Sequence, residues 1–135
     1  MYQQMIFVNL ATNDVDASKK FFTELGYTIN PQFSTDDCAC VVISDTIITM
    51  LLSKKRYADF TKKEIADSTK TSEVAICLSS ESREKVDELV QKAVAAGGTA
   101  NDDVQDQGFM YGRSFDDLDG HTWEIVWMDP AAVQG

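Results

Sequence analysis

Apolar residues recur in the first part of the chain at the spacing of an α-helix. Ala17, Phe21 and Leu25 lie four positions apart and so share one face of a helix. Asn13 precedes this face and can cap the first turn, while Gly26 follows it and can end the helix. The pattern therefore predicts a helix that begins near Asn13 and ends at Leu25.

A second helix is predicted in the other half of the chain. Residues 79–82 lead into it from the preceding strand. Two glycines, Gly97 and Gly98, end it. Its apolar stripe follows the spacing i, i+3, i+4, i+7 and i+8 and consists of Val86, Leu89, Val90, Ala93 and Val94.

Short runs rich in Val, Ile and aromatic residues predict strands around the two helices. They cover residues 5–10, 27–29, 39–43, 47–52, 73–78, 109–115 and 122–128, with a weaker, acidic run at 99–104. Strand, helix and three strands thus occur twice. We expect an α+β fold in which two βαβββ modules, about 1–66 and 67–135, form a curved mixed sheet with a cleft, within one domain spanning 1–135. Residues 53–72 form a polar connector.

Alternation along a strand places successive side chains on opposite faces. In the last strand Trp123, Ile125 and Trp127 share the face expected to pack under a helix, and Glu124 lies on the other face. In the strand at 73–78, Val74, Ile76 and Leu78 form the apolar face, and Glu73 lies opposite. Two carboxylates in one cleft can bind a divalent cation or act as general acid and base. The alternative is that they lie at strand ends in water.

The formal net charge of −10 argues against nucleic acid as a partner. No apolar run is long enough to cross a bilayer, and the N-terminus does not read as a signal peptide, so we expect a cytoplasmic protein. Cys38, Cys40 and Cys77 have no metal-site or redox-motif spacing and are expected to be small buried side chains. The single histidine, His121, is expected to stabilise a turn or to be solvated.

Six of the twelve basic residues lie between positions 54 and 70. This basic segment either steers an anionic ligand or is a solvated connector.

The segment from Phe115 to Glu124 resembles the D-P-D-G-H-x-x-E closing hairpin of the vicinal oxygen chelate superfamily. That group includes glyoxalase I, bleomycin resistance proteins, fosfomycin resistance proteins and extradiol dioxygenases. The stretch from Asp14 to Gly26 is similar to the D…FY…LG helix of the family, and the segment from Val86 to Gly98 is also similar. The resemblance covers nearly the whole chain and implies the paired βαβββ fold.

The resemblance also implies where metal ligands lie in members that bind a metal. The last ligand matches Glu124, and the ligand that heads the fifth strand, usually histidine, matches Glu73. The other two positions match Phe7 and Met50. Phenylalanine cannot bind a metal and methionine is a soft ligand, so the resemblance implies a degraded site that holds a divalent metal weakly or not at all.

We expect a protein that binds a small molecule in its cleft, as metal-free bleomycin resistance proteins do, and that forms a homodimer. The candidate ligand-binding residues are Phe7, Asn9, Met50 and Ser114, together with Glu73 and Glu124. One alternative is a lyase, isomerase or dioxygenase-type enzyme that uses Glu73 and Glu124 with or without a metal. Another is a non-catalytic module that binds a protein partner.

Overall fold

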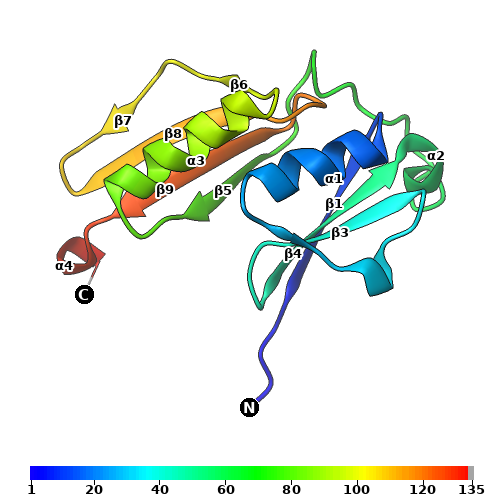
Figure 1. The fold of residues 1–135 in the computed structure, drawn as a ribbon, viewed down its shortest axis with the longest axis horizontal. Helices are drawn as coiled ribbons and strands as arrows, with labels where there is room; N and C mark the ends of the chain where they lie inside the picture. Colours follow the sequence, from blue (N-terminus) through cyan, green and yellow to red (C-terminus); the bar gives the residue numbers. More distant parts are fainter. Residues whose placement is uncertain (134–135) are drawn as a thin grey trace. The chain divides into compact units, whose positions relative to one another are not determined.

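One arrangement of strand, helix and three strands occurs twice in the computed structural model, which describes residues 1–133 (Figure 1). The chain divides into two compact units, Met1–Asp67 and Ser68–Gly135. Each unit has its own mixed sheet, and one long helix covers one face of that sheet. The α+β fold with two βαβββ modules is thereby confirmed, with two differences: the strands form two sheets and not one, and the strand after the second long helix is interrupted.

The first unit contains a four-stranded sheet in the order β1-β4-β3-β2, with β1 parallel to β4 and the other neighbours antiparallel. Its elements are β1 (Ile6–Thr12), α1 (Val15–Glu24), β2 (Thr28–Ile29), η1 (Pro31–Phe33), β3 (Cys38–Val42), β4 (Ile47–Ser53) and α2 (Lys54–Tyr57).

The second unit repeats this order as β5-β9-β8-β6, with β7 as an additional short partner of β8. Its elements are β5 (Ala75–Ser79), α3 (Arg83–Ala95), β6 (Thr99–Ala100), β7 (Gln105–Asp106), β8 (Met110–Asp116), β9 (Thr122–Met128) and α4 (Pro130–Val133). No helix within residues 1–133 combines the length and the apolar character needed to cross a bilayer.

The first long helix, α1, begins one residue later than its sequence pattern predicted. Asp14 caps it instead of Asn13: the backbone at Asp14 is extended, and its carboxylate accepts a hydrogen bond of 3.0 Å from the Ala17 N–H. This bond satisfies one of the backbone donors that a helix start leaves open. Phe21 and Leu25, which belong to the predicted apolar face, are buried, and so is the adjacent Phe22. Ala17, the first member of that face, is half-buried.

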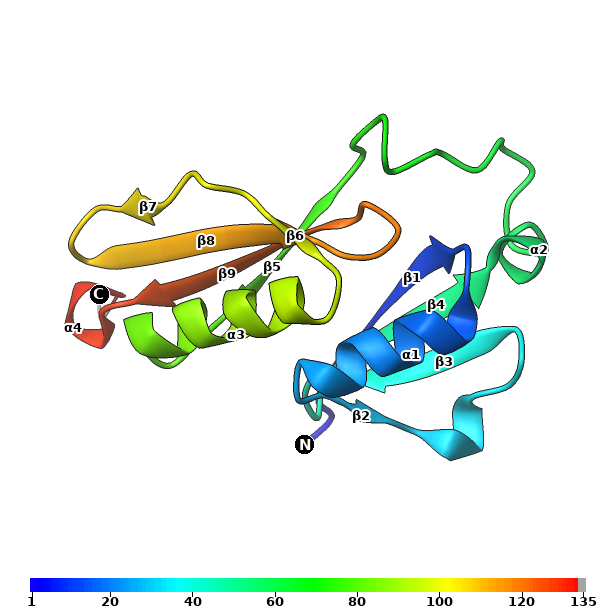
Figure 2. The same ribbon diagram turned by 45° about the horizontal axis from the view of Figure 1, so that its top comes forward.

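The second long helix, α3, lies along β8 and β9 (Figure 2). Ser82 caps it by accepting a hydrogen bond of 3.1 Å from the Lys85 N–H. Three members of the predicted apolar stripe, Val86, Val90 and Ala93, are buried. Leu89 is half-buried, and Val94 is 48% exposed, so the predicted stripe is too wide at its last position.

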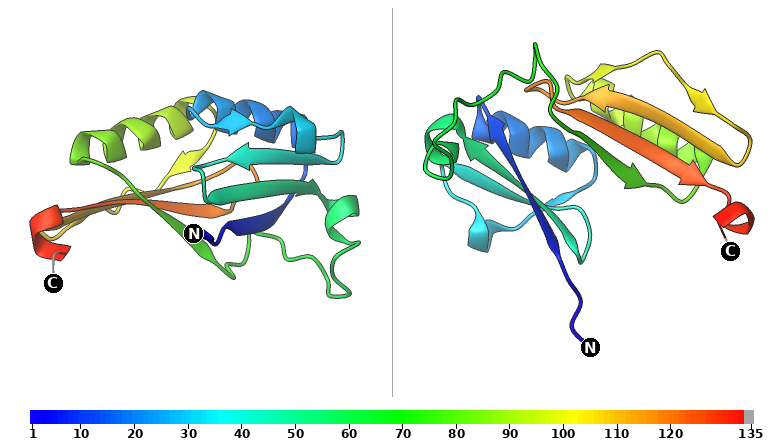
Figure 3. Two further views of the ribbon diagram at one scale, coloured as in Figure 1. Left: turned by 90° about the horizontal axis from the view of Figure 1, so that it is seen from below. Right: turned by 180° about the vertical axis from the view of Figure 1, so that it is seen from behind.

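Side chains of β9 alternate between the two faces of the second sheet as predicted. Trp123 and Ile125 are both 1% exposed and lie on the face that α3 covers. Glu124 is exposed on the opposite face. Figure 3 (right) shows each sheet from the side away from its long helix. In the second unit, that side is the face that carries Glu124.

Two predictions about β5 and its neighbourhood are wrong. The strand begins at Ala75, so Glu73 and Val74 precede it, and the Val74 side chain is 52% exposed instead of forming part of the apolar face. The reason is the register: Ala75 pairs with Thr122, the first residue of β9, so there is no strand beside residues 73 and 74. Cys77 is exposed rather than buried, because it lies on the face that α3 does not cover.

Candidate functional site

A pocket of about 290 Å³ lies on the second sheet, against β8 and β9 on the face that carries Glu124. Ser114 and Glu124 are cross-strand partners and both line it. The full lining consists of Asn101, Asp103, Gln105, Gly112, Arg113, Ser114 and Glu124. This volume is close to the lower limit of roughly 300 Å³ for ligand pockets, so the space suits a small molecule.

The pocket exists because one edge of the sheet is interrupted. The Asn101 N–H donates a hydrogen bond of 3.1 Å to the Ser114 carbonyl, and further along Gln105 pairs with Gly112. Three residues, 102–104, therefore lie opposite the single residue Arg113 and leave the ladder. We call residues 101–107 the edge segment. Three of its polar side chains line the pocket, and β8 and β9 supply the remaining lining residues.

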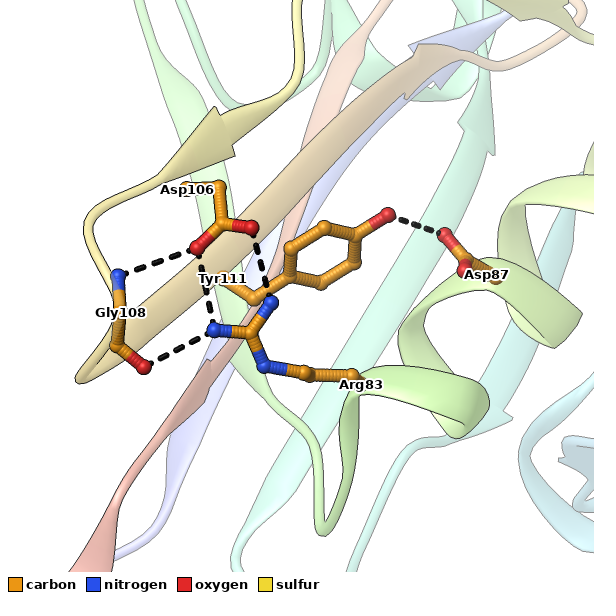
Figure 4. Close-up of polar contacts among 5 residues, drawn as sticks. All are labelled: Arg83, Asp87, Asp106, Gly108 and Tyr111. Atoms are coloured by element: carbon orange, nitrogen blue, oxygen red, sulfur yellow. Dashed lines mark hydrogen bonds and ion pairs between the residues drawn. The ribbon is translucent and has the colours of Figure 1, made fainter.

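An ion pair fixes the far end of the edge segment to the start of α3 (Figure 4). The Arg83 guanidinium donates two hydrogen bonds, of 2.9 and 3.0 Å, to the two carboxylate oxygens of Asp106. It donates a third, of 2.9 Å, to the Gly108 carbonyl. The same guanidinium lies 5.1 Å from the ring centroid of Tyr111, within the range of a cation–π contact. Planar two-point pairing of this kind fixes orientation as well as position.

A second set of contacts extends this network along α3. Tyr111 donates a hydrogen bond of 2.7 Å to the Asp87 carboxylate, as Figure 4 shows, and the Arg113 guanidinium approaches the same oxygen at 3.2 Å. Both the positive charge of Arg113 and that of Arg83 are thus paired on the helix side of the sheet. Neither arginine is therefore free to pair with a carboxylate that lines the pocket.

The Arg83 guanidinium and the Gly108 N–H lower the pKa of Asp106 from 3.8 to about 2. A lowered pKa means that the carboxylate stabilises the folded chain above pH 3.8, and that this contribution is lost as the pH falls toward 2. We expect an NMR titration of the side-chain carboxyl to give a midpoint near pH 2 in the wild type. In Arg83→Gln the midpoint is expected to move back toward 3.8.

Lys85→Gln is the matched control for this titration, because Lys85 is also in the first turn of α3 but pairs with Glu88 at 3.4 Å. Its effect on the Asp106 midpoint is expected to be small. An Asp106 pKa that is the same in Arg83→Gln and in the wild type would contradict the assignment of this ion pair.

The turn between β8 and β9 is organised by Asp117, the first aspartate of the closing motif. One carboxylate oxygen of Asp117 accepts hydrogen bonds from the Asp119 and His121 N–H groups, both at 3.0 Å. The other accepts one of 3.0 Å from the indole N–H of Trp123. Burial of the side chain raises the pKa of Asp117, although the nearby His121 and these donors act in the opposite direction. The turn therefore fixes the start of β9, and with it the position of Glu124.

Asp117, Asp119 and His121 each have a potential ligand atom within 4.8 Å of the others. The Asp117 oxygens already accept three hydrogen bonds that hold the turn. We therefore interpret the group as the structural centre of the turn and not as a metal site.

The structure places the candidate residues of the sequence analysis on two different sheets. Ser114 and Glu124 line the pocket of the second unit. Phe7, Asn9 and Met50 lie in the first unit: Asn9 pairs with Met50, and Phe7 is two residues before Asn9 on the same face, with 59% of its side chain exposed. Glu73 is exposed, lies in the bend before β5 and is not among the residues that line the pocket.

Cys77 occupies a place beside Glu124 that the sequence analysis had not connected with it. The two residues are directly paired across β5 and β9. Partial burial of the thiol, and then the negative charge of Glu124, raise the pKa of Cys77. The thiol is therefore less reactive than an ordinary cysteine at neutral pH.

Three lining residues, Asn101, Asp103 and Gln105, were not recognised from the sequence. The only signal was the acidic composition of the weak run at 99–104, which is unusual for a strand. An interrupted edge strand explains that composition.

The metal set implied by the superfamily does not fit the residues of this chain. Phe7 has no ligand atom, and the Met50 thioether is a soft ligand that is unsuited to hard divalent ions. Glu73 does not line the pocket that contains Glu124. Glu124 is the one carboxylate of the implied set that lines the pocket, and we derive no chemistry through a bound metal.

Comparison with known proteins agrees with the fold. The sequence profile of a family described as bleomycin resistance protein-like N-terminal matches residues 4–44. A hypothetical protein from S. aureus is similar at 30% identity with a TM-score of 0.78, and the match covers 94% of each chain. The search of curated proteins gave no match.

Two further solved structures share the fold at lower identity. A glyoxalase/bleomycin resistance protein/dioxygenase family enzyme from Burkholderia phytofirmans has 17% identity and a TM-score of 0.76, over 93% of this chain and 99% of the other. A fosfomycin resistance protein from Listeria monocytogenes has 17% identity and a TM-score of 0.66, over 94% of each chain.

The repeated βαβββ unit and the closing hairpin define a glyoxalase and bleomycin resistance-like protein. The matched N-terminal family and the shared fold agree with the resemblance of this chain to the vicinal oxygen chelate superfamily.

Proposed function

We propose that this chain binds a small polar organic molecule in the pocket of its second unit and does not depend on a chelated metal. The observation that carries the proposal is the pocket itself, which contains Ser114 and Glu124 side by side. Five of its lining side chains, besides the paired Arg113, offer hydrogen-bonding groups: Asn101, Asp103, Gln105, Ser114 and Glu124. A few convergent polar groups in a concave site are typical of small-molecule recognition.

Catalysis by Glu73 and Glu124 together is the less favoured alternative. Proton transfer by two carboxylates requires both to reach the same substrate, within about 3 Å of the protons that move. Glu124 lines the pocket, whereas Glu73 lies before β5 outside its lining. The geometry therefore supports binding more strongly than two-carboxylate chemistry.

A screen of water-soluble fragments by amide chemical shifts tests the proposal. We expect bound fragments to shift the amides of Gly112, Ser114 and Glu124. Ser114→Leu fills the pocket from β8 and is expected to weaken those fragments at least tenfold. Ser80→Leu, just beyond β5 and outside the lining, is the matched control. If no fragment shifts the pocket amides, or if Ser114→Leu binds as the wild type does, the proposal is wrong.

Calorimetry with manganese, cobalt, nickel and zinc ions tests the second half of the proposal. We expect no site tighter than millimolar, because one carboxylate and neutral side chains form a poor ligand set. Tight binding that disappears in Glu124→Gln would contradict the metal-independent account.

We also propose that the chain forms a homodimer in the cytoplasm. The resemblance to the superfamily supports dimerisation, and so does the exposed apolar edge strand β1, where the Ile6 and Phe7 side chains are 54% and 59% exposed. Three free cysteines are typical of a reducing compartment. Sedimentation at twice the chain mass of 15.0 kDa is the expected result, and a monomer mass would contradict it.

A further inference from the structure

The charges around the pocket are not balanced by the protein. Asp103 and Glu124 both line it, and within residues 1–133 neither carboxylate has a hydrogen bond or an ion pair. The one basic residue in the lining, Arg113, is paired with Asp87 at 3.2 Å. The pocket therefore carries two uncompensated negative charges at neutral pH.

This imbalance contrasts with the helix side of the same sheet. There Asp87 and Asp106 are each paired with an arginine, and the acidic group of Glu88 lies 3.2 Å from Lys92. The basic side chains Arg83, Lys92 and Arg113 thus form their ion pairs beside α3. The two carboxylates that line the pocket, Asp103 and Glu124, have no such partner within residues 1–133. Exposed acids without partners are common on proteins, but here two of them line one cavity together with two amide side chains and a hydroxyl.

We propose that the pocket takes a small organic cation, an amine or guanidine, whose positive charge lies between Glu124 and Asp103. The inference rests on the proposed function, since it names the class of molecule that the same pocket binds. The ammonium donates hydrogen bonds to the two carboxylates. The side-chain amides of Asn101 and Gln105 and the Ser114 hydroxyl bind further polar groups of the ligand.

The edge segment makes the site dependent on the ion pair at its far end. Asp103 belongs to residues 102–104, which leave the ladder, whereas Glu124 is fixed within β9. Arg83 holds Asp106, three residues after Asp103 in the chain. Arg83 is therefore a positioning residue: it keeps the Asp103 carboxylate near Glu124 without contacting the ligand.

Three four-carbon probes of matched size test the class of ligand: 1,4-diaminobutane, 1,4-butanediol and succinate. Binding is followed by the amide shifts of Gly112, Ser114 and Glu124 at low and at physiological salt. We expect the diamine to bind at least tenfold more tightly than the diol, and succinate not to bind. Diamine binding is expected to weaken as salt rises, because the interaction is between charges.

Variants then assign the charges. Glu124→Gln and Asp103→Asn are each expected to weaken the diamine at least threefold, and the double variant at least tenfold. Asp102→Asn is the matched control, because it removes the same charge from the neighbouring residue, which does not line the pocket. Arg83→Gln is expected to weaken the diamine and to speed amide exchange in residues 101–107, whereas a change at Glu124 leaves that exchange unaltered.

The possible failures are distinguishable. If the diol or succinate shifts the pocket amides as strongly as the diamine does, the cation assignment is wrong and the pocket remains a binding site. If none of the probes and no fragment shifts those amides, both the assignment and the proposed function are wrong. Equal weakening by Asp102→Asn would show that only net charge matters, and would also overturn the assignment.

Discussion

Replacing Asp117 with alanine is expected to lower the free energy of unfolding by about 3 kcal/mol. The Asp117 carboxylate accepts hydrogen bonds from the Asp119 and His121 N–H groups and from the Trp123 indole, and its side chain is buried. Each buried donor left without an acceptor costs on the order of 1–3 kcal/mol, partly offset because the buried carboxylate is no longer desolvated. Urea unfolding of the pure protein measures the change.

Two variants separate the hydrogen bonds of Asp117 from a general effect of mutation in the turn. Asp117→Asn keeps an oxygen for the two backbone donors but places an amide N–H₂ opposite the Trp123 indole, so we expect an intermediate loss. Asp116→Ala removes a single hydrogen bond of 2.8 Å from Thr122 and is expected to cost about 1 kcal/mol. A loss below about 1 kcal/mol in Asp117→Ala would contradict the central place of this carboxylate in the turn.

Gly120→Ala is expected to destabilise the chain by about 2–5 kcal/mol. Gly120 has φ = +85°, where a residue with a Cβ pays about 1–2 kcal/mol. A Cβ at this position would also lie 2.8 Å from the Ser68 carbonyl oxygen and 2.9 Å from its carbon. Because both are backbone atoms, the chain before β5 must move, and forced backbone shifts of this kind cost roughly 1–3 kcal/mol more.

Gly26→Ala is a control in which only the backbone conformation matters. Gly26 has φ = +105°, and a Cβ there would meet no atom within 4 Å. We expect this variant to lose only about 1–2 kcal/mol. The difference between the two variants in thermal or urea unfolding measures the close approach of the turn to residues 68 and 69. Equal losses would contradict that approach.

Local patterns in the sequence predicted most of the helices and strands. The four-residue spacing of Phe21 with its neighbours predicted α1, and the alternation around Glu124 predicted correctly that Trp123 and Ile125 are buried. Both are properties of a single segment, because one buried face imposes its period on the residues of that segment. The helix ends were also predicted locally, by Gly26 and Gly97, because both take φ above +100°, which favours glycine.

The start of β5 was wrong because it depends on another part of the chain. Val74 has a side chain that favours a strand, yet pairing extends back only to Ala75, opposite the first residue of β9. The composition of residues 73–78 does not indicate where the partner strand β9 begins. The expectation that Glu73 shares a site with Glu124 relied on this strand, and Glu73 does not line the pocket.

Only some of the residues that line the pocket could be predicted from the sequence, for a related reason. Ser114 and Glu124 belong to regular strands, so alternation placed them on the open face. Asn101, Asp103 and Gln105 belong to an interrupted edge, where no period exists to be recognised. The ion pair of Arg83 with Asp106 joins residues 23 positions apart, and side-chain pairing over that distance leaves no pattern along the chain.

The central claim is that Glu124 belongs to a pocket for a small organic molecule and not to a chelated metal centre. A crystal structure of the chain grown with 1,4-diaminobutane tests it most directly. The account predicts the diamine in the pocket, with one nitrogen about 2.8 Å from a Glu124 carboxylate oxygen. A metal ion held jointly by Glu124 and Glu73, or a pocket filled with water while the diamine binds elsewhere, would contradict it.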